Sequence, residues 1–162
     1  MRPDRLLESF ADLQESAAAE LRTKGVFVGL AEHILVGDPL HLEAEIDQTV
    51  AQLKGLAILV EPPRGANTKP QIFGALHLGD VTFPVTIAEA PLLNRGEGGT
   101  GITALRAVLE VMRALHGYRL PGTDVMLQAL GWEPVTDPEL VAHRATFRTS
   151  LTLPLNADLR ER

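Results

Sequence analysis

Residues 94–120 read NRGEGGTGITALRAVLEVMRALHGYRL, in which a glycine-rich stretch runs into the most regular helical pattern of the chain. The polar positions share one narrow stripe at helical spacing. Large apolar side chains cover the rest of the circumference: Ile102, Leu105, Val108, Leu109, Val111, Met112 and Leu115. This pattern predicts a central helix that is buried on more than one side, with Leu109 in the core. Thr100 is the expected N-cap, and Gly117 suits the left-handed position that ends a helix.

The glycines from Gly96 to Gly101 formally match the G-x-G-x-x-G pattern of dinucleotide-binding loops. In such folds the loop follows a strand directly, whereas here PLLNR precedes it. The acid expected at the end of a strand about twenty residues later is missing, because Asp124 lies in a turn-like PGTD. We therefore expect a flexible surface loop. A small nucleotide-binding domain or enzyme that uses this loop is the alternative.

The length and composition indicate one globular domain over residues 1–162. The sequence pattern places a helix in 1–25 and a frayed tail in 156–162. A net charge of −6 argues against broad nucleic-acid binding. The absence of cysteine excludes disulfides, thiolate zinc sites and cysteine nucleophiles. The apolar runs are too short to span a bilayer, and the N-terminus lacks the apolar core of a secretory signal. These features predict a soluble, cytoplasmic protein.

In the first half of the chain, apolar residues from Leu6 to Leu21 recur at helical spacing. Residues 26–36 are rich in β-branched side chains and predict one strand or a bent pair. Asp38 and Pro39 predict the start of a second amphipathic helix over residues 39–54. Residues 56–61 form a continuous apolar run that is typical of a buried strand.

The second half begins with a locally basic, proline-containing segment, residues 62–71, which we interpret as a polar loop. Gly79-Asp80 between two β-type runs predicts a hairpin turn. Pro84 cannot donate a ladder hydrogen bond, so the second strand of this hairpin is expected at an edge or with a bulge. Residues 125–130 suggest a short helix within a connector, and residues 143–153 alternate like a half-buried strand.

Strands with helices inserted between them, rather than strict β-α-β alternation, indicate the α+β class. We expect a mainly antiparallel sheet with the central helix packed across one face.

No credible catalytic constellation is found. The five histidines have no close metal-ligand spacing, and no serine lies in a nucleophile elbow. We therefore predict a protein that is not an enzyme, with no catalytic, cofactor-binding or metal-binding residues and no cofactor.

The only tryptophan, Trp132, is either an anchor of the connector on the core or an interface hot spot. Polar and basic loop or strand positions are the other natural contact sites, because loops on a rigid scaffold carry function. The candidate interface residues are Arg64, Asn67, Lys69, Arg95, Glu97, Trp132, Arg144 and Arg148.

The order of elements resembles the tail-terminator and tail-completion (head–tail joining) proteins of long-tailed bacteriophages. The resemblance lies in LAILVEPPRGANTKP, in VTFPVTIAEAP, in GTGITALRAVLEVMRALHG, and in the closing GWEPVTDPEL and HRATFRTSLTL. It covers nearly the whole chain.

The resemblance implies a homo-hexameric ring that caps the tail tube and joins it to the head connector. The partners would be the tail tube protein and the head-completion or connector protein. No membrane and no sequence-specific nucleic acid are implied, although DNA would pass through the ring. The location would be the virion tail or neck, after assembly in the host cytoplasm. A small adaptor or chaperone without a ring is a further reading.

Overall fold

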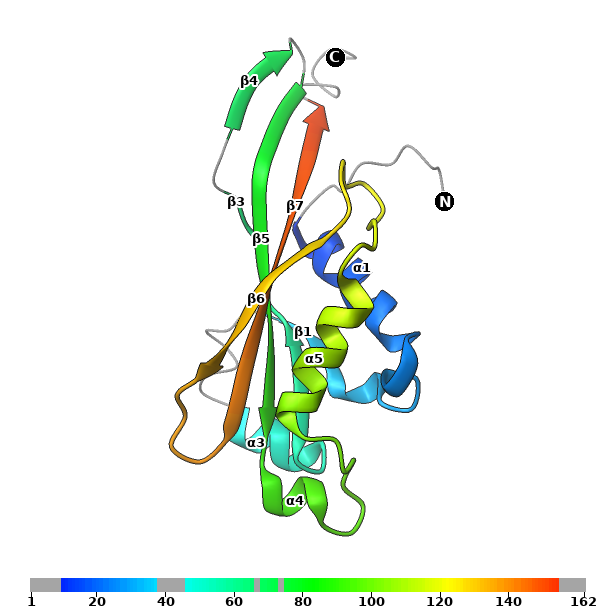
Figure 1. Cartoon of the computed structure of the whole chain (residues 1–162), viewed down its shortest axis with the longest axis vertical. Helices are drawn as coiled ribbons and strands as arrows, with labels where there is room; N and C mark the ends of the chain where they lie inside the picture. Colours follow the sequence, from blue (N-terminus) through cyan, green and yellow to red (C-terminus); the bar gives the residue numbers. More distant parts are fainter. Residues whose placement is uncertain (1–9, 38–45, 66–67, 73–74, 155–162) are drawn as a thin grey trace.

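A computed structural model describes residues 10–37, 46–65, 68–72 and 75–154. The elements in chain order are α1 (Phe10–Arg22), η1 (Gly25–Phe27), η2 (Ala31–His33), β1 (Ile34–Val36), α3 (Ile46–Gln52), β2 (Leu56–Val60), β3 (Arg64–Gly65), β4 (Thr68–Ile72), β5 (Ala75–Glu89), α4 (Pro91–Arg95), α5 (Ala104–Leu115), β6 (Gln128–Val135) and β7 (Val141–Pro154). Figure 1 shows a long, twisted sheet with α1 and α5 along one side and α3 and α4 near its lower end.

The strands form one sheet in the order β1-β2-β5-β7-β6, and β3 and β4 also pair with β5. Among the strands that the structure describes, only β1 and β2 run parallel, and the other pairs are antiparallel. The helix α5 lies across one face of this sheet, against β5 and β7 (Figure 1). The predicted α+β class, with a mainly antiparallel sheet and a central helix across one face, is confirmed.

The predicted hairpin at Gly79-Asp80 is wrong, because β5 runs straight through these residues. Leu78 pairs with Leu151 and Val81 pairs with Thr149, so β5 holds one extra residue at this point. The Gly-Asp pair therefore marks a β-bulge, the other structure that a glycine inside a β pattern indicates. The chain does not reverse here because β7 offers pairing partners on both sides of the bulge.

Pro84 lies in a central strand rather than at an edge. Its carbonyl accepts a hydrogen bond from the Glu61 N–H at 3.0 Å, so this side of Pro84 faces the end of β2. The nitrogen of a strand residue points to the same side as its carbonyl. That side is the break between β2 and β3, where the missing N–H of Pro84 interrupts no ladder.

The N-terminal helix is confirmed over α1, whose Leu13, Ala17 and Leu21 are fully buried; Leu6 lies outside the described residues. Of residues 26–36, only β1 is a strand. The preceding stretch folds into the short turns η1 and η2, which bury Phe27 and His33.

The second helix is confirmed for α3 alone, since residues 38–45, including Asp38 and Pro39, lie outside the described residues. Gly55 follows α3 with a φ of 97°, which suits glycine after a helix, and its N–H donates to the Val50 carbonyl.

The helix α5 packs against the sheet and against α1, as predicted, but its remaining side is exposed, which corrects the prediction for Leu109. Its core side consists of Ala104, Ala107, Val108, Val111 and Leu115. Leu105 and Leu109 are each 44% exposed. The helical pattern predicted burial of these two leucines. They are exposed because α1 covers one side of α5 and no described element covers the opposite side.

The ends of α5 also differ from the prediction at one point. The N-cap is Thr103, whose hydroxyl accepts from the Arg106 N–H at 3.2 Å, rather than Thr100. Gly117 follows the helix with a φ of 79°, as predicted.

Two segments predicted as irregular belong to the sheet. Residues 62–71 include β3 and most of β4, both paired with β5. Residues 125–130 form no helix, and β6 starts at Gln128 and includes Trp132. The glycine and proline of this stretch suggested a connector, but a bulge at Gly131 and the edge position of β6 accommodate both. The strand predicted over residues 143–153 is confirmed as part of β7.

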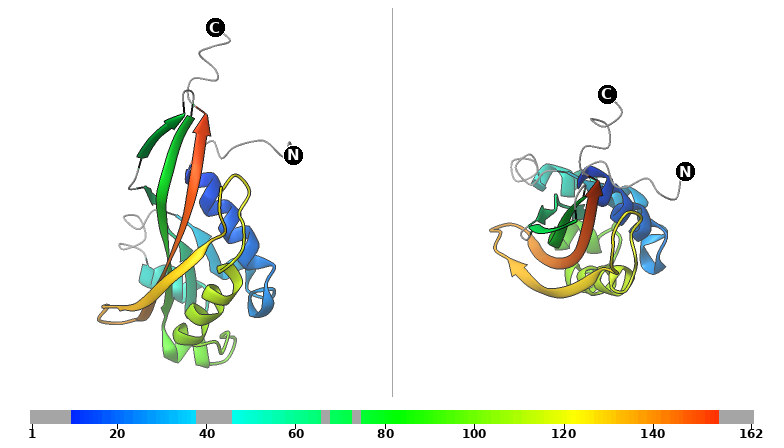
Figure 2. Two further views of the ribbon diagram at one scale, coloured as in Figure 1. Left: turned by 45° about the horizontal axis from the view of Figure 1, so that its top comes forward. Right: turned by 90° about the horizontal axis from the view of Figure 1, so that it is seen from above.

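The main core lies between the sheet and the helices α1 and α5, and the rings of Phe83 and Phe147 stack within it at 5.6 Å. A smaller cluster beneath α3, formed by Val50, Ala57, Ala88 and Ala142, lies on the opposite face of the sheet. Among the described helices, none is long and apolar enough to cross a membrane. Figure 2 gives two further views of the sheet and the helices around it.

Candidate assembly surfaces

The glycine-rich loop before α5 is built around the buried side chain of Asn94. Asn94 lies in α4 and is 0% exposed. Its Nδ2 donates to Glu89 Oε2 at 2.8 Å and to the Ile102 carbonyl at 2.6 Å. Its Oδ1 accepts from the Thr100 N–H at 3.3 Å and from the Thr100 hydroxyl. We call Glu89, Asn94, Thr100 and the backbone they hold the Asn94 network.

The same network occupies the N-terminus of α5. Glu89 is 1% exposed, and its Oε1 accepts from the Ala104 N–H, the first of the helix, at 2.9 Å. A carboxylate is favoured here because the unpaired N–H groups and the helix dipole give this end partial positive charge. The Arg95 guanidinium, 3.9 Å from Glu89 Oε2, adds a cation on the solvent side.

This geometry weighs against the nucleotide-binding alternative. The position at a helix N-terminus that would hold a phosphate is filled by the Glu89 carboxylate. The loop N–H groups of Gly99, Thr100, Gly101 and Ile102 donate within the segment itself. In addition, α4 separates the loop from β5, whereas a dinucleotide-binding loop follows its strand directly.

Two glycines allow the close approach of backbone that the network needs. A Cβ on Gly99 would lie 2.1 Å from the Asn94 carbonyl oxygen, and one on Gly55 would lie 2.4 Å from the Asn94 nitrogen. By contrast, a Cβ on Gly98 meets nothing within 4 Å. The loop is therefore closed by specific contacts rather than being the flexible loop expected from composition.

Three of the predicted interface residues share the face of the sheet opposite α5, which we call the outer face. Arg64 in β3 pairs with Thr82, and Thr82 pairs with Arg148. Residues directly opposite each other in a sheet share a face. Arg144, four residues before Arg148 on the same strand, lies on that face as well.

Arg144 holds the most buried carboxylate of the outer face. Its Nε donates to the Thr86 hydroxyl at 3.0 Å, and its Nη2 lies 3.5 Å from Glu61 Oε1. The Thr86 hydroxyl in turn donates to the same Glu61 oxygen at 3.2 Å. The Glu61 side chain is 5% exposed and that of Arg144 is 34% exposed, so the pair lies at the boundary with solvent.

Arg148 is more solvated than Arg144. It donates to Gln128 Oε1 at 2.7 Å and lies 3.9 Å from Asp80 Oδ1. Arg64 is exposed. The outer face thus combines exposed arginines with carboxylates rather than forming a purely basic patch.

Of the remaining predicted residues, Lys69 pairs by its backbone with His77 near the far end of β5, and Asn67 lies outside the described residues. Arg95 and Glu97 are exposed at the opposite end, beside the Asn94 network.

Trp132 lies on the face of the sheet that carries α5, because it pairs with the core residue Ala145. Its ring meets that of His143 edge-on at 5.2 Å. Trp132 is 43% exposed, and neighbouring Leu130 is 47% exposed. It therefore contacts the sheet and still offers surface, which combines features of both sequence interpretations.

Sequence reasoning missed the exposed side of α5, which we call the α5 flank: Leu105, Arg106, Leu109 and Arg113. Leu92 in α4, 93% exposed, was missed as well. Which apolar residues of a helix remain exposed depends on the elements that pack against it. The sequence pattern of the helix does not show which elements these are.

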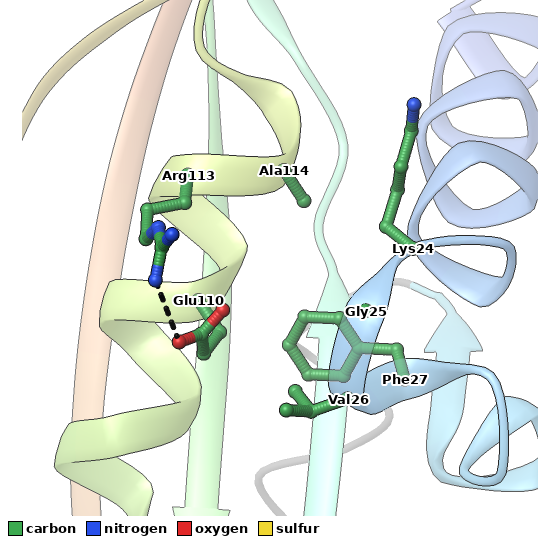
Figure 3. Close-up of a pocket in the computed structure, with 7 residues that line it drawn as sticks. All are labelled: Lys24, Gly25, Val26, Phe27, Glu110, Arg113 and Ala114. Atoms are coloured by element: carbon green, nitrogen blue, oxygen red, sulfur yellow. Dashed lines mark hydrogen bonds and ion pairs between the residues drawn. The ribbon is translucent and has the colours of Figure 1, made fainter.

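A hollow of about 190 Å³ lies between η1 and α5. Figure 3 shows Lys24 to Phe27 on one wall and Glu110, Arg113 and Ala114 on the other. Lys24 binds Glu20 at 2.8 Å, and this hydrogen bond raises the pKa of Lys24. Arg113 lies 3.3 Å from Glu110. Both cations of the hollow are thus paired with carboxylates of their own chain.

Among the described residues, no group of three or more histidine or acidic side chains could hold a metal ion. His33 bonds the Leu56 carbonyl at 2.8 Å, and His116 accepts from the Ala129 N–H at 3.1 Å. These two histidines therefore have structural partners.

No model of a known protein family matches the chain, and no curated protein matches it. Among solved structures, the fold is similar to a chain in the virion of a native gene transfer agent particle. The TM-score is 0.56 at 16% identity, and the match covers 87% of this chain and 95% of that chain.

Proposed function

We propose that this chain is a structural protein of a phage-like virion, which forms a ring at the end of a tail tube. The similarity to a chain of the gene transfer agent virion, over 95% of that chain, carries the proposal. The order of elements resembles tail terminators independently of this comparison. A match that spans nearly both chains supports a shared fold from end to end rather than one common motif.

The geometry of the sites supports an assembly role over an enzymatic one. The glycine-rich loop, the feature that most suggested nucleotide chemistry, is filled by the Asn94 network. The surface instead offers arginines on the outer face and exposed leucines on the α5 flank. Exposed apolar side chains beside charged ones are typical of surfaces that bind other proteins.

In this proposal six copies form the ring. The ring contacts the tail tube protein on one side and the head-completion or connector protein on the other, and DNA passes through its centre. The protein is assembled in the host cytoplasm and ends in the neck of the virion.

The test is to delete the protein from the producing cell and to image the particles by electron microscopy. We expect heads and tails that do not join and tubes of irregular length. The purified full chain should form rings of six, measured by native mass spectrometry. Normal joined particles after deletion would contradict the proposal.

Arg64 and Lys69 give a finer test of the same function. Arg64→Glu with Lys69→Glu should change the unfolding free energy by less than about 1 kcal/mol, as surface changes usually do. The double variant should still reduce the yield of joined particles, because charge reversal at a complementary interface creates repulsion.

The control for this double variant is Glu139→Lys, which reverses an exposed charge in the turn between β6 and β7. If the double variant unfolds, the charges of Arg64 and Lys69 are needed for the fold. If it folds and the particles join normally, this segment is not an assembly contact.

A further inference from the structure

The face of the sheet that carries α1 and α5 presents a different surface at each of its two edges. The sheet order places β1 at one edge and β6 at the other. The helix α1 packs on β1 and β2, whereas α5 packs on β5, β7 and β6. Figure 2 shows α1 and α5 side by side over the sheet. The exposed surface beside β6 therefore belongs to α5, and the exposed surface beside β1 belongs to α1.

The side of α5 is apolar and basic. Leu105 and Leu109 are one helical turn apart and each 44% exposed, so they form one strip. Arg106 and Arg113 border this strip, and the Arg113 side chain is 78% exposed. Trp132 of β6 presents a further exposed apolar ring on the same face of the sheet.

The side of α1 is acidic. Asp12, Glu15 and Ala19 are exposed and recur three or four residues apart, so they lie on one face of the helix. On the neighbouring turn η2, the Glu32 side chain is 80% exposed. Ala19, one helical turn after Glu15, is small enough to admit a bulky side chain from a partner beside the carboxylates.

We infer that the α5 flank of one copy docks on the acidic side of α1 in a second copy. This inference rests on the proposed ring and names the surfaces that close it. Leu105 and Leu109 would lie over Ala19, and Arg106 and Arg113 would meet Asp12 and Glu15. Because the two surfaces differ, each copy offers one of them to each neighbour, and such head-to-tail contacts close into rings.

Charge exchange tests this contact directly. Arg106→Glu alone places carboxylates against carboxylates, and Glu15→Lys alone places cations against cations. Each single variant should lose the ring and weaken association by at least about tenfold, since like charges across an interface repel. Both residues are exposed in the isolated chain, so melting temperatures should stay near that of the wild type.

Mixing the two variants should restore a ring of alternating copies. In the mixture, every contact is either the original Arg106–Glu15 pairing or its exact charge reversal. Native mass spectrometry would distinguish an alternating ring from rings of either variant, because Arg106→Glu lowers the mass of each copy while Glu15→Lys leaves it almost unchanged. Glu139→Lys serves as the control and should form rings like the wild type.

The outcomes separate this contact from the ring itself. Wild-type rings with no effect of either variant would overturn the contact and leave the proposed function standing. Rings lost in both variants but not restored by mixing would also overturn the contact. A wild type that stays monomeric at every concentration would overturn the ring and the contact together. Dimers that do not grow would exclude a head-to-tail arrangement.

Discussion

Glu89 and Glu61 are two nearly buried carboxylates that the protein holds in opposite ways. Glu89 accepts from the Ala104 N–H and the Asn94 amide, which are neutral donors inside the fold. Glu61 accepts from the Thr86 hydroxyl and pairs with Arg144, which is itself one-third exposed. The first arrangement fixes backbone, since it ties the end of β5 to the start of α5. The second joins side chains of neighbouring strands at the boundary with water.

The difference predicts unequal costs of disruption. A buried donor or acceptor that loses its partner retains the full desolvation penalty, whereas a group near solvent recovers water. The Asn94 network should therefore matter more to stability than the Glu61 pair, although the arginine beside Glu61 lies closer to its carboxylate than Arg95 does to that of Glu89.

The largest effect should come from Asn94→Ala. This change removes the amide that joins Glu89, Thr100 and the Ile102 carbonyl, and it leaves a buried carboxylate short of donors. We expect a loss of about 3–5 kcal/mol in the unfolding free energy, measured by urea denaturation. Glu97→Ala, three residues away and exposed, is the control. A cost below about 1 kcal/mol for Asn94→Ala would show that the Asn94 network contributes little to the free energy of unfolding.

Gly99→Ala should come next. Its Cβ would lie 2.1 Å from the Asn94 carbonyl oxygen, so the loop must shift away from the network. A cost of about 2–3 kcal/mol is expected by thermal or urea unfolding, as for an overpacked site. Gly98→Ala meets open space and pays only for its positive φ, about 1 kcal/mol. Equal costs for the two variants would show that the loop does not close on Asn94 in solution.

Arg144→Met should have a smaller effect, because it removes one partner of Glu61 and keeps the Thr86 hydroxyl in place. The expected cost is about 1–2 kcal/mol in urea unfolding. Arg148→Met is the matched control on the same strand, and its more exposed pair should contribute less than about 0.5 kcal/mol. If the control costs as much as Arg144→Met, burial of Glu61 is not what distinguishes the two arginines.

The smallest effect on stability should come from Leu109→Asp. Leu109 is 44% exposed, so the new carboxylate stays in water and the change should cost less than about 1 kcal/mol. The variant should fold with a native circular dichroism spectrum and fail to form rings. Insoluble or unfolded protein would indicate that Leu109 is buried, as the helical pattern alone predicts.

Local patterns predicted the elements whose environment repeats along the chain. The alternation from Ala145 to Leu151 predicted this part of β7, because one face of the strand is buried from Ala145 to Leu151. The same alternation placed Arg144 and Arg148 outward. A local pattern could not predict the bulge at Gly79-Asp80, because glycine is common in both turns and bulges. Whether the chain turns or bulges here depends on its pairing with β7.

The Asn94 network was missed because its parts look unremarkable in sequence. Glu89 ends an apolar strand, Asn94 lies within PLLNR, and Thr100 lies among glycines. Their proximity depends on α4 folding back towards the start of α5, which no spacing rule encodes. A usable signal was the requirement that the first N–H groups of α5 find acceptors, together with an acidic residue at the end of the preceding strand.

The long β5–β7 pair has a mechanical consequence. The two strands pair from Ala75 opposite Pro154 to Glu89 opposite Val141, with a shift of register at the Gly79-Asp80 bulge, over nearly the length of the molecule. Their hydrogen bonds lie perpendicular to the strands. A force that pulls β5 and β7 apart along their own axis therefore loads all these bonds at once, in shear, instead of opening them one by one. Tension applied through the ends of this pair would meet a stiff element, and its resistance would be governed by the rate of forced unfolding rather than by equilibrium stability.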